Sequence, residues 1–302
     1  MLFAGHETFH VRDGWLHKGI VAISNNPFTF ADPNATDDLG VGRNMVNAIR
    51  YWLVASGMAV EARETVDGRA KVKLIATSLG ELVFKQDRYL EEELTLWTLH
   101  REMACNFNRA TAWFWLFNRC PLTRLDSQTF INYLSRWIMQ EQPKKPIALA
   151  SLQKDFNCIV RTYSPGNLRN RKLTPEDTFE SPFASLRLME YLENSETLRL
   201  NVGSRRIDPS AFAYATLQFV RSLNRETKEV GLNELQSAPF SPGRVFLLGA
   251  DSLIEAISGI AELFGKKSFA FSRTGGLNTL RVGDVEPFEV LADAYSRIGA
   301  RR

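Results

Sequence analysis

The stretch at residues 36–57, TDDLGVGRNMVNAIRYWLVASG, constrains the fold more than any other part of this sequence. Thr36 can cap a short helix, because its hydroxyl oxygen can accept a hydrogen bond from a backbone N–H that the first turn leaves unpaired. The letters GVG that follow allow a tight turn, since glycine tolerates a left-handed backbone. A second helix is then predicted over residues 43–56, with Gly57 as its stop. Two helices joined in this way predict a helix-turn-helix.

The second predicted helix has two chemically different faces. Its apolar residues recur at the spacing that buries one face, and they are Met45, Val46, Ile49, Trp52 and Leu53. Its opposite face carries Arg43, Asn44, Asn47 and Arg50. Arginine can bond guanine, asparagine can bond adenine, and either can hold a phosphate. This face therefore suits a DNA groove, but a surface helix that only meets water is the alternative that the helix alone leaves open.

A β-hairpin is predicted directly after this helix. Strands over residues 60–65 and 71–76 flank an Asp-Gly pair, which is a strong hairpin signal. The basic residues of the hairpin are Arg63, Arg69, Lys71 and Lys73. With a helix predicted over residues 14–24 before it and another starting at Thr77, the order of elements is that of a winged helix. Since a winged helix can also dock proteins, DNA binding does not follow automatically.

The whole chain is predicted to be mainly helical, in the α+β class. We expect a winged-helix-like DNA-binding domain at residues 1–90, a helical domain at 91–180 and an α+β domain at 181–302, the last containing a degenerate second winged helix as one alternative. Within the last region the pattern predicts a short helix at 183–192 and a strand at 244–248.

Composition narrows the class of protein. The chain has 302 residues, 44% of them hydrophobic and 24% charged, which is typical of a globular protein. The net charge of +3 is compatible with nucleic acid but not diagnostic of it. No apolar run reaches the roughly 18 residues of a membrane span, and the start of the chain lacks the pattern of a signal peptide. Cys105, Cys120 and Cys158 are far apart and odd in number, so we expect reduced thiols and a cytoplasmic location.

The letters HETFH match the zinc-protease pattern H-E-x-x-H at His6, Glu7 and His10. Gly14 and His17 would extend that pattern, but each comes one residue too late to serve it. The alternative is a buried or capping His6–Glu7 pair with two surface histidines, and a match this short arises easily by chance.

A dense group of basic residues lies at the end of a predicted helix over residues 147–163 and in the segment directly after it. Its members are Arg161, Arg169, Arg171 and Lys172. Such a segment usually only meets solvent, but it is also a candidate for phosphate contact.

The N-terminal pattern GHETF at residues 5–9, followed by Arg12, Trp-Leu at 15–16 and Lys-Gly at 18–19, resembles a bacterial family long described as a domain of unknown function. The likeness continues through LGVGRNMVNAIRYWL, TSLGELVF, YLEEELTLWTLH, DFNCIVRTY, SPGRVFLL and TGGLN, and so covers nearly the whole chain. This SspB-like family occurs in DNA phosphorothioation (Ssp) anti-phage gene clusters, in which sulfur replaces a non-bridging phosphate oxygen. The resemblance implies double-stranded DNA as a partner, together with a cysteine desulfurase, an ATPase and an ATP-pyrophosphatase-like enzyme.

The resemblance also implies a component that nicks one DNA strand, with Mg²⁺ or Mn²⁺ as its cofactor. The sequence holds no nuclease motif that identifies the metal ligands, and no P-loop, so any ATP use belongs to a partner. The candidate catalytic residues are His6 and Glu7, with Arg12 and Lys18 beside them to bind phosphate. The structural alternative is that Glu7 pairs with Arg12 and pins the N-terminal segment. Two functions remain open: a DNA nickase, and a non-catalytic adaptor or transcription-type regulator that binds DNA and recruits partner enzymes.

Overall fold

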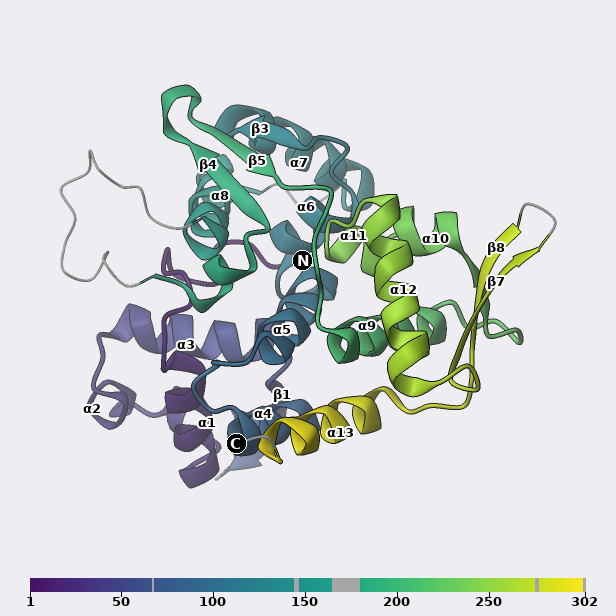
Figure 1. Ribbon diagram of the computed structural model, residues 1–302. Coiled ribbons are helices and arrows are strands. Elements are labelled where there is room, and N and C mark those ends of the chain that lie inside the picture. The colour runs from purple at the N-terminus through teal and green to yellow at the C-terminus, as the bar shows by residue number, and fades with distance from the viewer. Residues whose placement is uncertain (67, 144–146, 165–179, 275–276, 301–302) are drawn as a thin grey trace.

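The computed structural model describes residues 1–66, 68–143, 147–164, 180–274 and 277–300, and it is a mixed α+β structure rich in helices (Figure 1). The N-terminal elements follow the predicted order. They are α1 (Trp15–Asn25), the 3-10 helix η1 (Thr29–Ala31), α2 (Ala35–Leu39), α3 (Arg43–Ala55), β1 (Ala59–Val66), β2 (Arg69–Ala76) and α4 (Ser78–Gln86).

Helix α3 is held by the apolar face that its sequence predicts. Val46, Ile49 and Leu53 are buried, and α3 packs against α1 and α2. Gly19 of α1 allows this close approach, because a Cβ there would lie 2.6 Å from Leu53 Cδ1. The predicted cap of α2 is wrong: the helix begins at Ala35, so Thr36 lies inside it.

The predicted hairpin is present as an antiparallel pair, with Glu64 opposite Lys71 and Val60 opposite Ile75. Gly68 supplies the positive φ of 72° that its turn requires, while Asp67 lies outside the described residues. The backbone N–H of Leu74 also donates to the carbonyl of Pro27, 2.9 Å away, so a segment before η1 borders the hairpin.

The middle of the chain is helical, as predicted, apart from one short strand. Its elements are α5 (Glu93–Cys105), α6 (Thr111–Asn118), β3 (Arg124–Asp126), α7 (Ser127–Glu141) and α8 (Leu149–Tyr163). Asp126 caps α7 by accepting a hydrogen bond from the Thr129 N–H at 2.7 Å. The three-residue β3 was not predicted.

The remaining elements alternate short helices with short strands. They are η3 (Pro182–Leu186), β4 (Met189–Leu192), η4 (Glu193–Ser195), β5 (Thr197–Leu200), α9 (Pro209–Ser222), β6 (Glu229–Gly231), α10 (Leu232–Ser237), α11 (Pro242–Val245), α12 (Ala250–Phe264), β7 (Phe269–Thr274), β8 (Leu277–Val282) and α13 (Pro287–Gly299). The helix predicted at 183–192 is wrong, because the chain leaves η3 and pairs as β4 with β5. The strand predicted at 244–248 is also wrong: Pro242 opens a short helix there, capped by Ser241.

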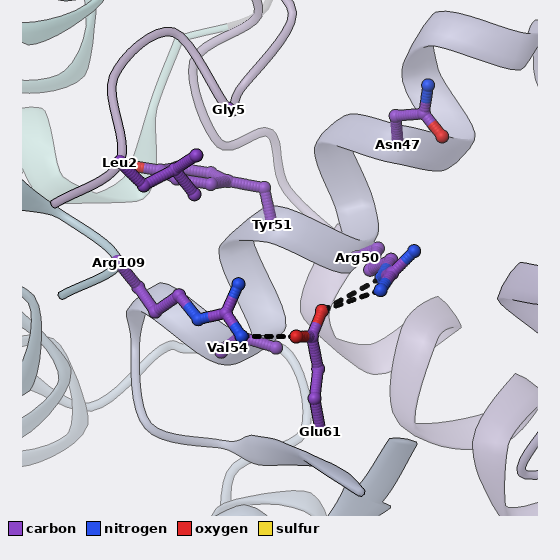
Figure 2. Close-up of a pocket in the computed structure, with 8 residues that line it drawn as sticks. All are labelled: Leu2, Gly5, Asn47, Arg50, Tyr51, Val54, Glu61 and Arg109. Carbon is purple, nitrogen blue, oxygen red and sulfur yellow. Dashed lines mark hydrogen bonds and ion pairs between the residues drawn. The ribbon is translucent and has the colours of Figure 1, made fainter. Parts of the chain in front are cut away.

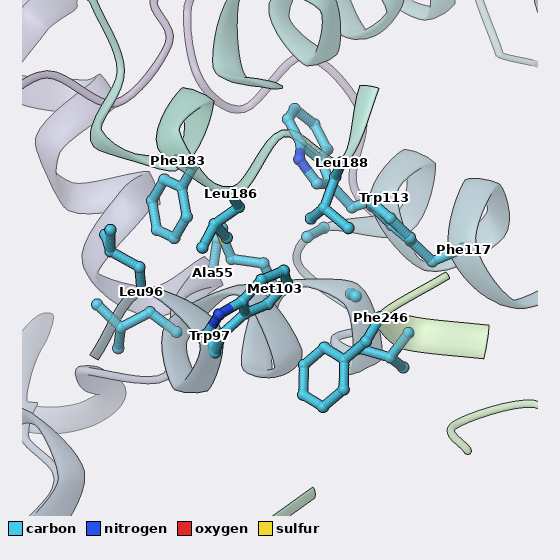
Figure 3. Close-up of a cluster of buried hydrophobic side chains, with 14 of the residues drawn as sticks. Ala55, Leu96, Trp97, Met103, Trp113, Phe117, Phe183, Leu186, Leu188 and Phe246 are labelled. Carbon is cyan, nitrogen blue, oxygen red and sulfur yellow. The ribbon is translucent and has the colours of Figure 1, made fainter. Parts of the chain in front are cut away.

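The described strands form three small antiparallel sheets, in the orders β1-β2, β3-β5-β4 and β6-β8-β7. Helix α5 lies near the middle of the molecule (Figure 1) and packs against α6, α9, α11 and η3. Figure 3 shows Trp97 and Met103 of α5 among Trp113, Phe183 and Phe246, which come from three other segments. One continuous apolar core therefore joins elements that are far apart in the sequence. Within the described part of the chain, no helix is both long and apolar enough to cross a bilayer.

Candidate functional site

The GHETF segment forms a turn that carries His6 into the protein interior. The His6 side chain is fully buried, with its ring 5.7 Å from that of Tyr51 and 5.8 Å from that of Trp113. Its Nδ1 accepts a hydrogen bond from the Thr8 backbone N–H (3.1 Å), so Nε2 is the nitrogen that donates to Asp155 Oδ1 (2.8 Å). This packing gives His6 a structural environment, which favours the buried alternative that the sequence leaves open.

Asp155 lies on α8 and joins the N-terminal segment to that helix. Its Oδ1 also accepts a hydrogen bond from the Ala4 backbone N–H at 2.9 Å. Burial raises the pKa of the Asp155 carboxyl, and the hydrogen bond from His6 opposes that shift. Two bonds to one buried carboxylate oxygen thus fix the position of residues 4–6.

The zinc-protease pattern has no helix to support it. Glu7 and Thr8 have positive φ values of 50° and 73°, and helix α1 begins only at Trp15. His6 and His10 therefore do not lie one helical turn apart on a common face. His10 is buried, which contradicts the expectation of a surface histidine.

The other candidates near the start of the chain have separate neighbours. Glu7 is exposed, and its Oε1 lies 3.5 Å from Nδ2 of Asn47. The Arg12 guanidinium lies over the rings of Phe9 and Trp15, at 5.3 and 5.2 Å. Lys18 donates from Nζ to the Leu39 carbonyl oxygen at 2.9 Å, which ties α1 to α2.

The polar face of α3 is exposed to solvent at the start of the helix, and further along it is bonded to a neighbouring strand. Arg43 and Asn44 are exposed, and Asn47 is half-buried. Arg50 donates from Nε and Nη2 to Oε1 of Glu61 on β1, at 3.1 and 2.7 Å. The first turns of α3 therefore present exposed side chains, whereas Arg50 is 33% exposed and is held in place by Glu61.

The hairpin presents basic residues beside α3. Arg63, Arg69 and Lys71 are exposed, and Lys73 forms an ion pair with Glu64. Arg69, Lys71 and Lys73 alternate along β2, so they share one face of the strand. The predicted contacts at Arg169, Arg171 and Lys172 lie outside the described residues, while Arg161 is in the last turn of α8.

A pocket of about 210 Å³ lies between α3, β1 and the loop before α6, and Figure 2 shows its centre. Glu61 lies there between two arginines, because Arg109 donates from Nη2 to its second carboxylate oxygen. Tyr51 and Leu2 form part of the wall. Neither Arg109 nor Glu61 was predicted from the sequence as a site residue. No local pattern marks them, since 48 residues separate the two.

A metal site is not assembled by the described residues. They contain no group of three or more His, Cys, Asp or Glu side chains that could hold an ion. Glu61 has both oxygens bonded to arginine, and one oxygen of Asp155 is bonded to His6. Cys105, Cys120 and Cys158 are free thiols, as expected.

Comparisons with known proteins identify the family of this chain. The model of a family described as "Protein of unknown function (DUF4007)" matches residues 3–295. Two solved structures are similar: an SspB crystal structure (TM-score 0.88) and a magnesium ion-bound SspB crystal structure (TM-score 0.87). Each is 29% identical over 97% of this chain and 88% of the SspB chain. No curated protein matches. The chain belongs to the SspB-like DUF4007 family.

Proposed function

We propose that this protein is the DNA-binding component of a bacterial DNA phosphorothioation system. Its similarity to SspB over 97% of the chain supports a role in such a system, as does the family resemblance of its motifs. Its partners would then be double-stranded DNA and the sulfur-insertion enzymes: a cysteine desulfurase, an ATPase and an ATP-pyrophosphatase-like protein.

The observation that carries the proposal is the exposed beginning of α3. In helix-turn-helix proteins the N-terminal residues of the recognition helix contact base edges in the major groove. Here those residues are Arg43, Asn44 and Asn47, whose side chains suit guanine, adenine and phosphate. The buried face of α3 fixes the helix on α1, so the polar face has a defined direction.

The neighbouring elements support a winged-helix module with α3 as its recognition helix. The order α1, α2, α3, β1, β2, α4 is that expected of the module. The backbone hydrogen bond from Leu74 to Pro27 places the segment before η1 beside β2, as a third segment next to the hairpin. Arg69 and Lys71 on the exposed hairpin would then hold phosphates beside the groove.

Binding to a labelled DNA duplex, measured at several salt concentrations, tests the proposal. We expect affinity to fall as salt rises, because phosphate contacts release counterions. Arg43→Ala should weaken binding roughly tenfold, the loss typical of a charged hydrogen bond. Unchanged affinity of this variant at low salt would remove α3 as the recognition helix.

Nicking of one strand is the second candidate, favoured by similarity to an SspB that binds magnesium. The described residues do not fit a three-ligand site for Mg²⁺ or Mn²⁺. Conversion of supercoiled to open-circular plasmid, with and without a chelator, tests the activity itself. A metal-dependent product would support a nickase, while DNA binding without cutting would support the adaptor.

A further inference from the structure

We propose that Arg50 and Arg109 form a binding site for a DNA backbone phosphate, and that Glu61 holds the two guanidinium groups in place before DNA arrives. This inference rests on the proposed DNA binding and extends it to a residue outside the helix and hairpin. The ligand is the phosphodiester of a duplex strand that flanks the groove occupied by α3.

The charges of the cluster favour an anion. Two arginines share a single carboxylate, which leaves one positive charge in the pocket. Arg50 and Arg109 are 33% and 40% exposed, so both can be reached from solvent. Arginine presents five N–H donors in a planar fork, and only three of the ten donors in this pair are bonded within the described residues. The remaining donors are available to phosphate oxygens.

The position along α3 agrees with a backbone contact. Arg50 follows Arg43 by seven residues, and an α-helix rises 1.5 Å per residue, so their Cα atoms are about 10 Å apart along the axis. The major groove is about 12 Å wide. If the first turn of α3 lies in the groove, Arg50 and its neighbour Arg109 approach the phosphates at the groove edge.

The shape of the site agrees with a small ligand. Its volume of about 210 Å³ is below the roughly 300–1,000 Å³ of pockets for drug-sized molecules. Gly5 lies at its wall, where a Cβ would come within 2.7 Å of Tyr51 Cδ2. The GHETF turn therefore shapes one side of the pocket, and α3 shapes another (Figure 2).

Glu61 has two opposing effects on phosphate binding, and a substitution can separate them. Its oxygens fix both guanidinium groups, but its charge opposes a phosphate placed between them. Replacing the carboxylate by an amide keeps an acceptor oxygen and removes the opposing charge. Glu61→Gln should therefore strengthen DNA binding, whereas Arg109→Ala should weaken it.

The test measures binding of the full-length protein to a fluorescent DNA duplex across a salt series. Arg109→Ala should bind roughly tenfold more weakly at moderate salt. The slope of log K against log salt should become shallower by about one, the value for a lost phosphate contact. Glu61→Gln should bind roughly threefold more tightly, since it removes a like charge from the interface. Thermal unfolding of each variant checks that the fold is intact.

Arg225→Ala is the matched control, because Arg225 is also an exposed arginine paired with a glutamate, Glu234. An equal loss in this control would assign the effect to net charge and overturn the site. Weaker binding by both pocket variants, without a change in salt slope, would also overturn it. If Arg43→Ala weakens binding while Arg109→Ala matches the control, the phosphate site fails and the proposed function stands. If the wild-type protein binds no duplex, the proposed function fails first.

Discussion

The Nε2 atom of His6 lies 2.8 Å from Oδ1 of Asp155, a residue 149 positions further along the chain. The imidazole and the carboxylate are both buried, and the same carboxylate oxygen receives the Ala4 N–H. This bond anchors the GHETF turn to α8 and brings Gly5 to the wall of the pocket beside α3.

His6→Ala should destabilise the protein by about 3–5 kcal/mol, because removing one partner of a buried pair leaves the other uncompensated. Chemical denaturation measures this change. Glu7→Ala is the matched control in the same turn, and since Glu7 is exposed its effect should stay within about 0.5 kcal/mol. A His6→Ala protein with wild-type stability but no nicking activity would instead support the catalytic role.

Gly80→Ala should destabilise the protein by about 1–3 kcal/mol, the usual range for overpacking. A Cβ at Gly80 of α4 would lie 2.0 Å from the Met58 carbonyl oxygen, so the backbone must move to admit it. Gly42→Ala provides the control, because its φ of −64° suits any residue and no atom lies within 4 Å. Denaturation midpoints of the two variants should differ clearly, and equal midpoints would contradict the close packing of α4 on Met58.

His100 should make the protein less stable as the pH falls below neutrality. Burial lowers its pKa to about 3; the hydrogen bond to the Val245 carbonyl opposes the shift, and the charge of Arg205 adds to it. Its unfolded pKa is 6.5. Between those values the unfolded chain binds a proton that the native state excludes, so the stabilisation present above pH 6.5 is lost as the pH falls toward 3.

Chemical denaturation of the wild type and of His100→Gln, at about pH 7.5 and about pH 4.5, measures that loss of stability. The variant will be less stable at the higher pH, because Tyr163 loses its bond to Nδ1. Its stability should nevertheless fall by less between the two pH values. A parallel loss in both proteins would exclude His100 as a source of the pH dependence.

The hairpin and α3 should contribute differently to DNA binding. Lys71→Ala should weaken binding to all duplex sequences alike and make the salt slope shallower by about one. Asn47→Ala should instead reduce the preference for one sequence over another, by about 1–3 kcal/mol per base pair read. Competition with duplexes of different sequence separates the two effects, and a sequence-dependent loss in Lys71→Ala would contradict the assignment.

Local patterns predicted much of the N-terminal half. The apolar spacing of α3, the alternation of the two hairpin strands and the helix start near Thr77 each depend on a few neighbouring residues, and the two helices and the strand pair are present. Prediction failed where a short element depends on distant partners. Met189 to Leu192 form a strand because β5 lies beside them, and nothing within those four residues indicates it. Helix α13 was overlooked, although Pro287 at its first position is a start signal.

The candidate site was predictable only in part. The exposed residues of α3 and the hairpin follow from periodicity, so Arg43 and Lys71 could be named. The links between His6 and Asp155, and between Glu61 and Arg109, depend on tertiary packing that no local spacing encodes. His6 and Glu7 are adjacent in sequence, but one is buried and the other exposed, so adjacency was a poor guide to a shared role.

Helix α13 packs against α9 and α4, and its Tyr295 hydroxyl lies 2.6 Å from Oγ1 of Thr95, a residue 200 positions earlier. During synthesis on the ribosome, the region around α4 and α5 therefore emerges long before the helix that covers it. Contacts between such distant residues slow folding, because a long loop must close before they form. We expect the growing chain to expose apolar surface around α4 and α5 until residues 287–299 are released, which makes that interval a natural point for chaperone binding.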